Sequence, residues 1–259
     1  MRLPEVIGLV PAAGKATRIA PLPCSKELLP VGSWSVDEGQ NVRPKAVCQY
    51  LLERMRLGGV GKAYFILRAG KWDIPTYFGD GSVLGMSLAY LVMRLPFGVP
   101  YTLDQAYPFV QNHVVALGFP DIIFEPKDAF VHLLDQLSTT DADIVLGLFP
   151  TDQPQKADVV EFDPGGQIRS IIIKQEQTGL RYAWIIAVWT PVFTRFIHEY
   201  LSSDQVGKNV SADRELFVGD IVQAAIESGL RVKGLSFPEG TYLDIGTPDD
   251  LAKAREKYK

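Results

Sequence analysis

The chain has 259 residues, enough to bury a substantial core within one large α/β domain. Hydrophobic residues make up 47% and charged residues 22%, a composition typical of a folded globular protein rather than a disordered one. The formal net charge is −4 and no run of five basic residues occurs, so the electrostatic signature of a nucleic-acid-binding protein is missing.

Cysteine content and hydropathy argue against several further classes of protein. Cys24 and Cys48 are the only cysteines and do not form a CxxC pair, which argues against a disulfide framework and a zinc site. The N-terminal segment lacks the apolar core of a secretion signal, and no stretch approaches the roughly 18 apolar residues that cross a bilayer. We therefore expect a cytoplasmic protein without a membrane partner.

Short apolar runs alternate with amphipathic stretches along the chain. The runs predict buried strands over residues 6–10, 63–67, 113–117, 143–148 and 184–188. Apolar residues return at three- and four-residue intervals in the predicted helices, which cover residues 44–57, 128–137, 191–201 and 213–228. Strands separated by helices predict an α/β fold with a doubly wound, mostly parallel sheet of Rossmann-like type.

Two segments interrupt this alternation. Residues 33–42 are polar and unpatterned, which predicts a surface loop. Residues 159–173 instead contain two apolar runs separated by Pro164-Gly165-Gly166, a turn signal that predicts a β-hairpin.

The first predicted strand runs into the segment PAAGKATR, residues 11–18. Its small residues lie at the carboxyl edge of the sheet, where ligands bind in such folds, and they leave backbone N–H groups open to phosphate oxygens. Lys15 and Arg18 add positive charge to the same loop. A tight turn that merely requires small residues has the same pattern, so the loop alone leaves both interpretations open.

The longer segment over residues 8–31 closely resembles the signature of the sugar nucleotidylyltransferases. In that family a small-residue loop ending in Thr-Arg is followed by Pro-Lys or Ser-Lys and then Leu-Leu-Pro. The Pro-Ala-Ala-Gly and Lys-Glu-Leu-Leu-Pro parts are most similar to glucose-1-phosphate uridylyltransferases, and Ser25-Lys26 to thymidylyltransferases. Later segments match in the family's order and extend the resemblance over residues 6–254: Arg43-Pro44-Lys45, Gly79-Asp80-Gly81-Ser82, Pro120-Asp121, Val160 to Asp163 with Lys174, and Tyr242 to Pro248.

The resemblance implies transfer of a nucleotidyl group from a nucleoside triphosphate to a phosphorylated sugar. Arg18 is expected to bind the β- and γ-phosphates, Lys26 the α-phosphoryl oxygens and Lys174 the sugar phosphate. Asp121 and Asp244 are expected to hold Mg²⁺. The further residues that it implies are Ala12, Ala13, Gly14, Lys15, Thr17, Met93 and Gly98 for the nucleotide, and Tyr182 and Ile186 for the sugar.

The same resemblance assigns nucleotide binding to residues 1–125 and sugar-phosphate binding to residues 126–259 of a single domain. Similar enzymes are often dimers or tetramers, which makes a homo-oligomer an expectation here as well. The two metal-site aspartates should converge at the carboxyl edge of the sheet within roughly 8 Å of each other and face the loop over residues 12–18, because a bound Mg²⁺ allows little more than that separation.

The sequence departs from the family pattern mainly where the sugar is recognised. Ala16 stands where the family has glycine, and Ile173 stands where a glutamate usually contacts sugar hydroxyls. Ile185 and Ile186 replace a small or polar pair, and Met93 replaces a glutamine that reads the base. These changes favour a deoxygenated sugar or another phosphorylated alcohol, or else a catalytically weakened relative that binds nucleotides in a regulatory role.

Several features receive a structural interpretation instead. Thr247 followed by proline and two aspartates predicts a helix N-cap. We expect His113, His132 and His198 to serve packing, because no acid–base partner lies at a telling spacing. A nicotinamide-dependent dehydrogenase is disfavoured since the first loop lacks the Gly-x-Gly-x-x-Gly fingerprint.

Overall fold

A computed structural model describes residues 4–35, 42–94, 98–175, 178–203 and 215–258. Its main sheet contains the strands β1 (Val6–Ala12), β4 (Lys62–Arg68), β5 (Ser87–Met93), β6 (Val114–Gly118), β8 (Ile144–Pro150), β9 (Asp158–Phe162), β10 (Ile168–Ile173), β11 (Tyr182–Trp189) and β12 (Val232–Ser236). Two small sheets pair β2 (Pro30–Ser35) with β3 (Val42–Ala46) and β7 (Ile122–Glu125) with β13 (Thr241–Asp244).

The main sheet is mixed, with a parallel half built around β1. Strand β1 lies between β4 and β6 and is parallel to both, and β5 extends the parallel part beyond β4. On the other side β11 runs antiparallel to β6 and β8, while β12 pairs parallel with β8. The predicted doubly wound, mostly parallel α/β sheet is confirmed.

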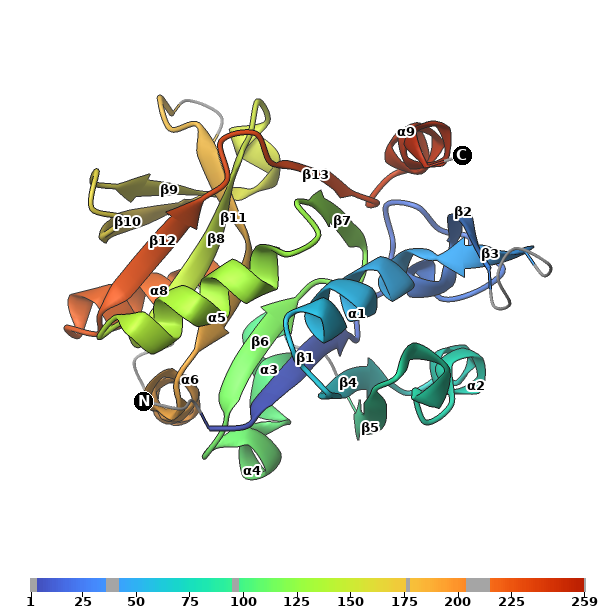
Figure 1. Cartoon of the computed structure of the whole chain (residues 1–259), viewed down its shortest axis with the longest axis horizontal. Coiled ribbons are helices and arrows are strands. Elements are labelled where there is room, and N and C mark those ends of the chain that lie inside the picture. The colour runs from blue at the N-terminus through green and yellow to red at the C-terminus, as the bar shows by residue number, and fades with distance from the viewer. Residues whose placement is uncertain (1–3, 36–41, 95–97, 176–177, 204–214, 259) are drawn as a thin grey trace.

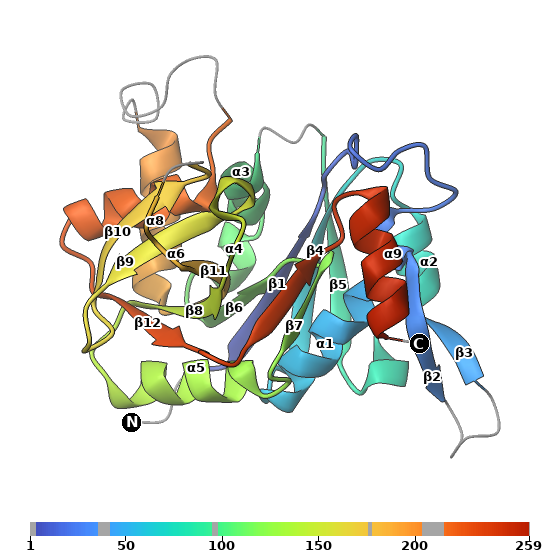
Figure 2. The same ribbon diagram turned by 90° about the horizontal axis from the view of Figure 1, so that it is seen from above.

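Helices cover both faces of this sheet (Figures 1 and 2). One face carries α1 (Val47–Leu57), α2 (Asp73–Phe78) and α5 (Ala129–Thr139), and the other carries α3 (Val99–Asp104), α4 (Tyr107–Val110), α6 (Pro191–Ser202) and α8 (Val218–Glu227). Helix α9 (Pro248–Lys257) packs beside β2. Short 3₁₀ turns are η1 (Lys26–Leu28), η2 (Ser82–Leu84) and η3 (Pro154–Lys156).

Each face of the sheet buries its own apolar cluster. Leu51 of α1 and Phe130 of α5 contribute to one cluster, and Trp189 of β11 and Phe193 of α6 to the other. Helix α1 lies very close to the sheet because a Cβ atom at Gly118 would stand 2.2 Å from a methyl carbon of Leu51. Glycine at the end of β6 therefore fixes the distance between α1 and the strand that leads to Asp121.

A third, smaller apolar cluster lies beside the first loop and the β7–β13 pair. Ile19 and Leu29 anchor the segment after β1, and Ile123 and Ile245 anchor the two paired strands. Arg54 of α1 adds a polar tie, since its buried Nε donates to the carbonyl of residue 124 over 2.7 Å. The segments that carry Arg18, Lys26, Asp121 and Asp244 are thus packed on one common core.

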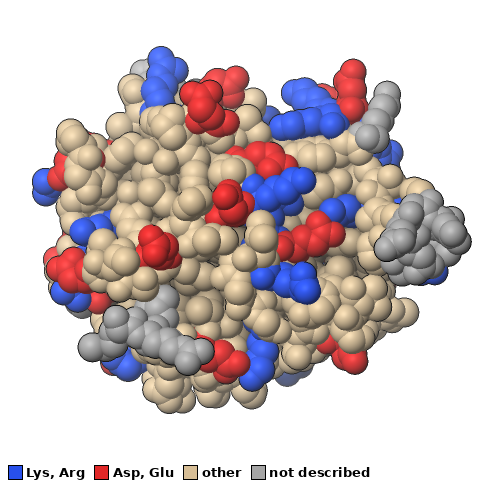
Figure 3. Space-filling model, in the orientation of Figure 1, with Lys and Arg blue, Asp and Glu red and all other residues tan. Residues whose placement is uncertain are grey.

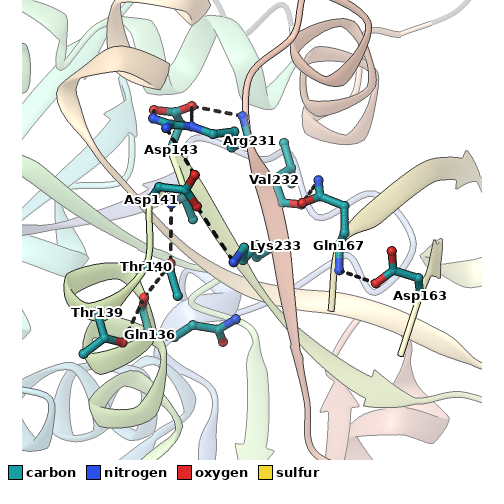
Figure 4. Close-up of polar contacts among 11 residues, drawn as sticks. Gln136, Thr139, Thr140, Asp141, Asp143, Asp163, Gln167, Arg231, Val232 and Lys233 are labelled. Atoms are coloured by element: carbon teal, nitrogen blue, oxygen red, sulfur yellow. Dashed lines mark hydrogen bonds and ion pairs between the residues drawn. The ribbon is translucent and has the colours of Figure 1, made fainter. Parts of the chain in front are cut away.

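A polar network joins the opposite, amino-terminal ends of β8 and β12 (Figure 4). Arg231 contacts Asp143 through Nη2 at 3.2 Å and Asp141 through Nη1 at 3.4 Å. Gln167 at the start of β10 donates from Nε2 to the carbonyl of Val232 over 3.0 Å. These contacts hold β12 and the β9–β10 hairpin in register away from the carboxyl ends of the strands.

The predicted elements differ from the observed ones mainly at their ends. The hairpin expected over residues 159–173 is confirmed as β9–β10, and Thr247 caps α9 by accepting from the backbone N–H of Asp250 at 3.2 Å. The helix expected from residue 44 begins at Val47, because residues 42–46 pair with β2. Most of the expected loop 33–42 lies outside the described residues, but both its ends are strands. The last predicted helix begins at Val218, not at residue 213, which lies outside the described residues.

Acidic and basic side chains are interspersed on the face drawn in Figure 3. The part of that face which the structure describes carries no continuous basic surface. Within the described ranges, no helix combines the length and apolar character that a membrane crossing requires.

Candidate active site

A cavity of about 880 Å³ opens at the carboxyl ends of β1 and β6. The chain leaves the sheet from β1 toward β4 on one side, whereas β6 lies on the other, so these two neighbours form a topological switch point. Ligands of α/β proteins bind in the crevice at such a point. A volume of this size suits a nucleotide-sized molecule.

The loop after β1 forms one wall of the cavity. Every residue from Ala13 to Arg18 lines it, whereas Ala12 is buried within the strand. Ala16 has a φ of 56°, in the left-handed region that favours glycine. Glycine adopts this conformation without strain, and the present chain adopts it with alanine.

Arg18 extends from this loop to the end of β13. A Cβ atom at Gly246 would lie 2.8 Å from an Nη atom of Arg18 and 3.4 Å from Oδ1 of Asp244. The absence of a side chain at Gly246 therefore allows the guanidinium and the carboxylate to share one small region.

Asp121 and Asp244 come together through the pairing of two short strands. Asp244 is opposite Ile122 in the antiparallel register, and the backbone N–H of Ile245 donates to the carbonyl of Asp121 over 2.9 Å. Both aspartates line the cavity on the side of the first loop. Residues 123 positions apart in sequence therefore present two neighbouring carboxylates to one volume.

Lys26 lies against this pair and forms an ion pair with Asp121. Burial alone would lower the pKa of Lys26, but the Asp121 carboxylate outweighs that effect and the pKa lies above its ordinary value. The turn before Lys26 is fixed by Ser25, whose backbone N–H and hydroxyl donate to the carboxylate of Asp73 over 2.6 and 2.7 Å. Lys26 is thus a charged lysine held against Asp121, beside Asp244.

Burial, and then the negative charge of Asp121, raise the pKa of Asp244 to about 6. The two carboxylates therefore repel each other in the absence of an added cation. Lys26 and Arg18 oppose the shift but do not cancel it. This electrostatic imbalance is what a bound divalent cation would correct.

A second ion pair lies directly behind Lys26. Oε1 of Glu27 accepts from Nζ of Lys71 over 2.6 Å, with the two side chains 1% and 4% exposed. Burial raises the pKa of Glu27 despite the Lys71 charge, and burial lowers the pKa of Lys71. The pair connects the η1 turn to the segment that follows β4.

Lys174 reaches the cavity from the end of β10. Its backbone φ is 43°, and its ammonium lies 3.7 Å from the centre of the Phe217 ring. A cation held against an aromatic face, with its backbone in a rarely used conformation, is well placed to receive an anionic group.

A nucleotidyl transferase family profile matches residues 7–259 of the sequence. The chain belongs to the nucleotidyl transferase family. It is 25% identical over 253 residues to the low-salt glycan biosynthesis nucleotidyltransferase Agl11 of Haloferax volcanii, with 96% of this chain and 65% of that protein covered. It is also 25% identical to a glucose-1-phosphate thymidylyltransferase of Neisseria meningitidis, with 95% of this chain and 80% of that protein covered.

Solved structures show the same fold. A crystal structure of UDP-glucose pyrophosphorylase with UDP-glucose superimposes with a TM-score of 0.77 at 17% identity, covering 97% of each chain. The cavity of the present chain therefore belongs to a nucleotidyl transferase fold, and the expectation of that family from sequence is confirmed.

The donor set in the cavity fits Mg²⁺. Among the described residues no group of three or more His, Cys, Asp or Glu side chains is arranged to hold a metal ion. Asp121 and Asp244 supply oxygen ligands only, and Mg²⁺ in nucleotide enzymes is commonly bound by one or two carboxylates together with phosphates and water. Burial and then the Asp121 charge raise the pKa of Asp244, and a cation bound between the two carboxylates would favour the ionised form of Asp244.

Most of the expected site residues line the cavity of this family member, but four do not. Ala13, Gly14, Lys15, Thr17, Arg18, Lys26, Gly98, Asp121, Lys174 and Asp244 line it. Met93 is 5% exposed in the core, and Tyr182 packs edge-on against Phe162 with ring centres 5.5 Å apart. Ile186 packs on Gly147, where a Cβ atom would lie 2.7 Å from its Cγ1. Ala12 is the fourth, inside β1.

Sequence reasoning did not single out the aromatic lining of the cavity. Phe119, Trp184, Phe217 and Tyr242 line it together with Thr151, whose Oγ1 lies 2.8 Å from the Tyr242 hydroxyl. Phe119 directly precedes Pro120-Asp121, and Tyr242 begins the segment Tyr242 to Pro248, so these two residues lie at motifs that the sequence marked. Trp184 within β11 and Phe217 directly before α8 lie outside those motifs.

The histidines lie away from the cavity lining. His113, His132 and His198 each contact a carboxylate, at 3.7, 3.3 and 2.9 Å, although the sequence suggested no such partner. His198 also stacks on Tyr107 with ring centres 3.8 Å apart. Cys24 and Cys48 are both free thiols.

Proposed function

We propose that this protein transfers a nucleotidyl group from a nucleoside triphosphate to a sugar 1-phosphate and releases pyrophosphate. The observation that carries the proposal is the shared cavity: the small-residue loop with Arg18, the Lys26–Asp121–Asp244 group, and Lys174 all line one volume. The relatives named as glucose-1-phosphate thymidylyltransferase and UDP-glucose pyrophosphorylase support a sugar phosphate as the acceptor.

The reaction requires two anions, the nucleoside triphosphate and the acceptor phosphate, to be held together while negative charge develops on the departing pyrophosphate. A phosphate oxygen of the acceptor forms a bond to the α-phosphorus, and the bond from that phosphorus to the oxygen bridging the α- and β-phosphates breaks. Catalysis consists mainly of positioning and of compensating negative charge. The protein supplies no covalent intermediate in this scheme.

Each cation of the cavity has a distinct part in that scheme. Arg18 binds the β- and γ-phosphates and stabilises the departing pyrophosphate through its planar guanidinium. Lys26 neutralises the α-phosphoryl oxygens, which compete with Asp121 for its ammonium. Lys174 holds the acceptor phosphate at the other end of the cavity.

Asp121 and Asp244 would hold Mg²⁺. When bound, the ion supplies positive charge to the triphosphate and orients it. The nucleoside triphosphate is a cytoplasmic metabolite, which supports the cytoplasmic location that the sequence suggests.

The decisive screen combines each common nucleoside triphosphate with a panel of sugar 1-phosphates and Mg²⁺, and follows pyrophosphate. We expect release that requires nucleotide, acceptor and metal together. The Asp244→Asn variant should bind the nucleotide poorly and lose the Mg²⁺-dependent rate. Absence of pyrophosphate with every pair, alongside tight nucleotide binding by calorimetry, would favour the regulatory alternative instead.

A further inference from the structure

Trp184 is a buried hydrogen-bond donor that lacks an acceptor. The residue is 5% exposed, it lines the cavity, and its Nε1 atom is buried without a hydrogen-bond partner in the part of the chain that the structure describes. Buried indole N–H groups normally find an acceptor, because leaving one unpaired loses a hydrogen bond to water without replacement. Trp189, on the same strand, follows this rule by donating to Oγ1 of Thr194 over 2.9 Å.

The position of Trp184 in the sheet puts it between the two ends of the reaction site. Its ring lies 5.7 Å from that of Phe119, which precedes Asp121 by two residues. The neighbouring residue Ala183 pairs with Val159, next to Asp158, and Asp158 in turn pairs with Ile173 beside Lys174. An acceptor whose phosphate is held by Lys174 and directed at the metal-site aspartates would therefore pass over the Trp184 side chain.

The residues beside Trp184 in this wall are apolar. The Phe119 and Trp184 rings are inclined by 54° and both line the cavity, and Ile185 lines it next to them. The C–H groups of a sugar ring pack well on aromatic faces, whereas a hydroxyl directed there would remain unpaired. Of Phe119, Trp184 and Ile185, Trp184 is the one with a polar side-chain atom, the buried indole N–H that lacks a partner among the described residues.

We propose that Trp184 reads the acceptor: its ring packs on a C–H face of the sugar and its Nε1–H donates to one sugar oxygen. This inference rests on the proposed function and specifies its acceptor. It favours a pyranose 1-phosphate that keeps the one hydroxyl opposite Trp184, and disfavours a phosphorylated alcohol without a further oxygen. Trp184 thereby supplies a polar contact to the sugar in a chain that has Ile173 where the family has a glutamate.

The test combines a substitution at Trp184 with the removal of single hydroxyl groups from the substrate, and compares the effects of the two changes made separately and together. Trp184→Phe keeps an aromatic ring and removes the N–H group. With glucose 1-phosphate and its 2-, 3-, 4- and 6-deoxy analogues as probes, the wild type should lose on the order of 10- to 100-fold in kcat/KM for one analogue. Trp184→Phe should show a comparable loss with glucose 1-phosphate and little further loss with that analogue.

Trp189→Phe is the matched control, because it removes an indole N–H from the same strand that already has a partner in the core. It should keep the wild-type ranking of the analogues. A second measurement uses NMR of the wild-type protein, and the two variants serve only to assign its indole N–H resonances. The Trp184 resonance should move downfield when glucose 1-phosphate binds, and the Trp189 resonance should not.

The outcomes separate this inference from the function on which it rests. Turnover in which Trp184→Phe discriminates among the analogues as the wild type does, with an unmoved Trp184 resonance, overturns the reading role alone. Absence of turnover with every nucleotide and acceptor overturns the proposed function, and the reading role with it. Loss of discrimination in Trp184→Phe but not in Trp189→Phe supports both.

Discussion

Lys26 carries the clearest consequence for a single side chain. Replacing it by alanine leaves Asp121 without its partner and, in the proposed reaction, removes a preorganised positive charge at the transferring phosphoryl group. We expect Lys26→Ala to lower kcat by at least about 100-fold. Lys62→Ala, which removes a half-exposed lysine paired with Glu5, is the control and should leave the rate near that of the wild type. A Lys26→Ala enzyme with more than a tenth of the wild-type rate would remove Lys26 from the mechanism.

Asp244 links stability to pH in the metal-free protein. Its carboxyl pKa rises from 3.8 to about 6 on folding because of burial and then the charge of Asp121. The folded state therefore binds the proton more tightly, so this group's contribution to stability is present below pH 4 and is lost as pH rises through about 6. The shift corresponds to at most about 3 kcal/mol.

Asp244→Asn should accordingly stabilise the metal-free protein at pH 8 relative to the wild type, and have a smaller effect at pH 4. Urea unfolding in the presence of a chelator measures this difference. Adding Mg²⁺ with nucleotide should then stabilise the wild type more than the variant. Equal pH profiles for the two proteins would show that Asp244 is not the strained carboxylate.

Removing one partner of the buried Glu27–Lys71 pair should lower the free energy of unfolding more than removing both charges does. Lys71→Met leaves a fully buried carboxylate unpaired, which we expect to cost about 3–5 kcal/mol of unfolding free energy. The double variant Glu27→Gln/Lys71→Met should recover a large part of that loss. Additive losses in urea unfolding would mean that the two side chains are not coupled.

At the scale of elements, the placement of Asp121 and Asp244 depends on the small core beside β7 and β13. Ile245 is fully buried there, directly after Asp244. Ile245→Ala should cost about 2–5 kcal/mol and also weaken Mg²⁺-dependent nucleotide binding, because β13 loses its anchor. Ile197→Ala on α6 is a matched core change away from the site and should destabilise without affecting nucleotide affinity. Equal effects of both changes on nucleotide affinity would contradict this dependence.

The order of the elements could largely be predicted from the sequence. The strand–loop–helix order and the motifs around Asp121 and Asp244 follow local patterns. The carboxyl end of β6 places Asp121 at the sheet edge, and the antiparallel pairing of β13 with β7 brings Asp244 beside it. The face of β11 on which the Ile186 side chain lies was not predictable in this way. A β-bulge between Trp184 and Ile186 changes the alternation of β11, so Ile186 joins the core and Trp184 lines the cavity.

Residues 42–46 illustrate a second limit. Their sequence fits the start of a helix, but Arg43 and Pro44 pair with β2 and the helix begins only at Val47. Pairing across a hairpin overrode the local pattern. The ion pair between Glu27 and Lys71 likewise could not be predicted from the sequence. The two residues are 44 positions apart, and charged residues are normally expected at the surface.

For the whole molecule, the fold brings opposite charges into one cavity at the price of some stability. Among the described residues, seven carboxylates and five basic side chains line it, and Asp121 and Asp244 are two of these carboxylates that repel each other. A ligand that supplies the missing positive charge should therefore stabilise the entire chain. The extent follows the ratio of ligand concentration to dissociation constant, about 2.7 kcal/mol at a hundredfold excess.

We infer that the nucleotidyl group passes directly from the triphosphate to the acceptor in this cavity. The most direct measurement follows the label from a nucleoside triphosphate labelled at the α-phosphorus, with Mg²⁺ and each sugar 1-phosphate in turn. We predict that the label appears in a nucleotide sugar, only when the acceptor is present, and in amounts equal to the pyrophosphate formed. Label that stays in the triphosphate with every acceptor, or that is released as nucleoside monophosphate without one, would contradict the account.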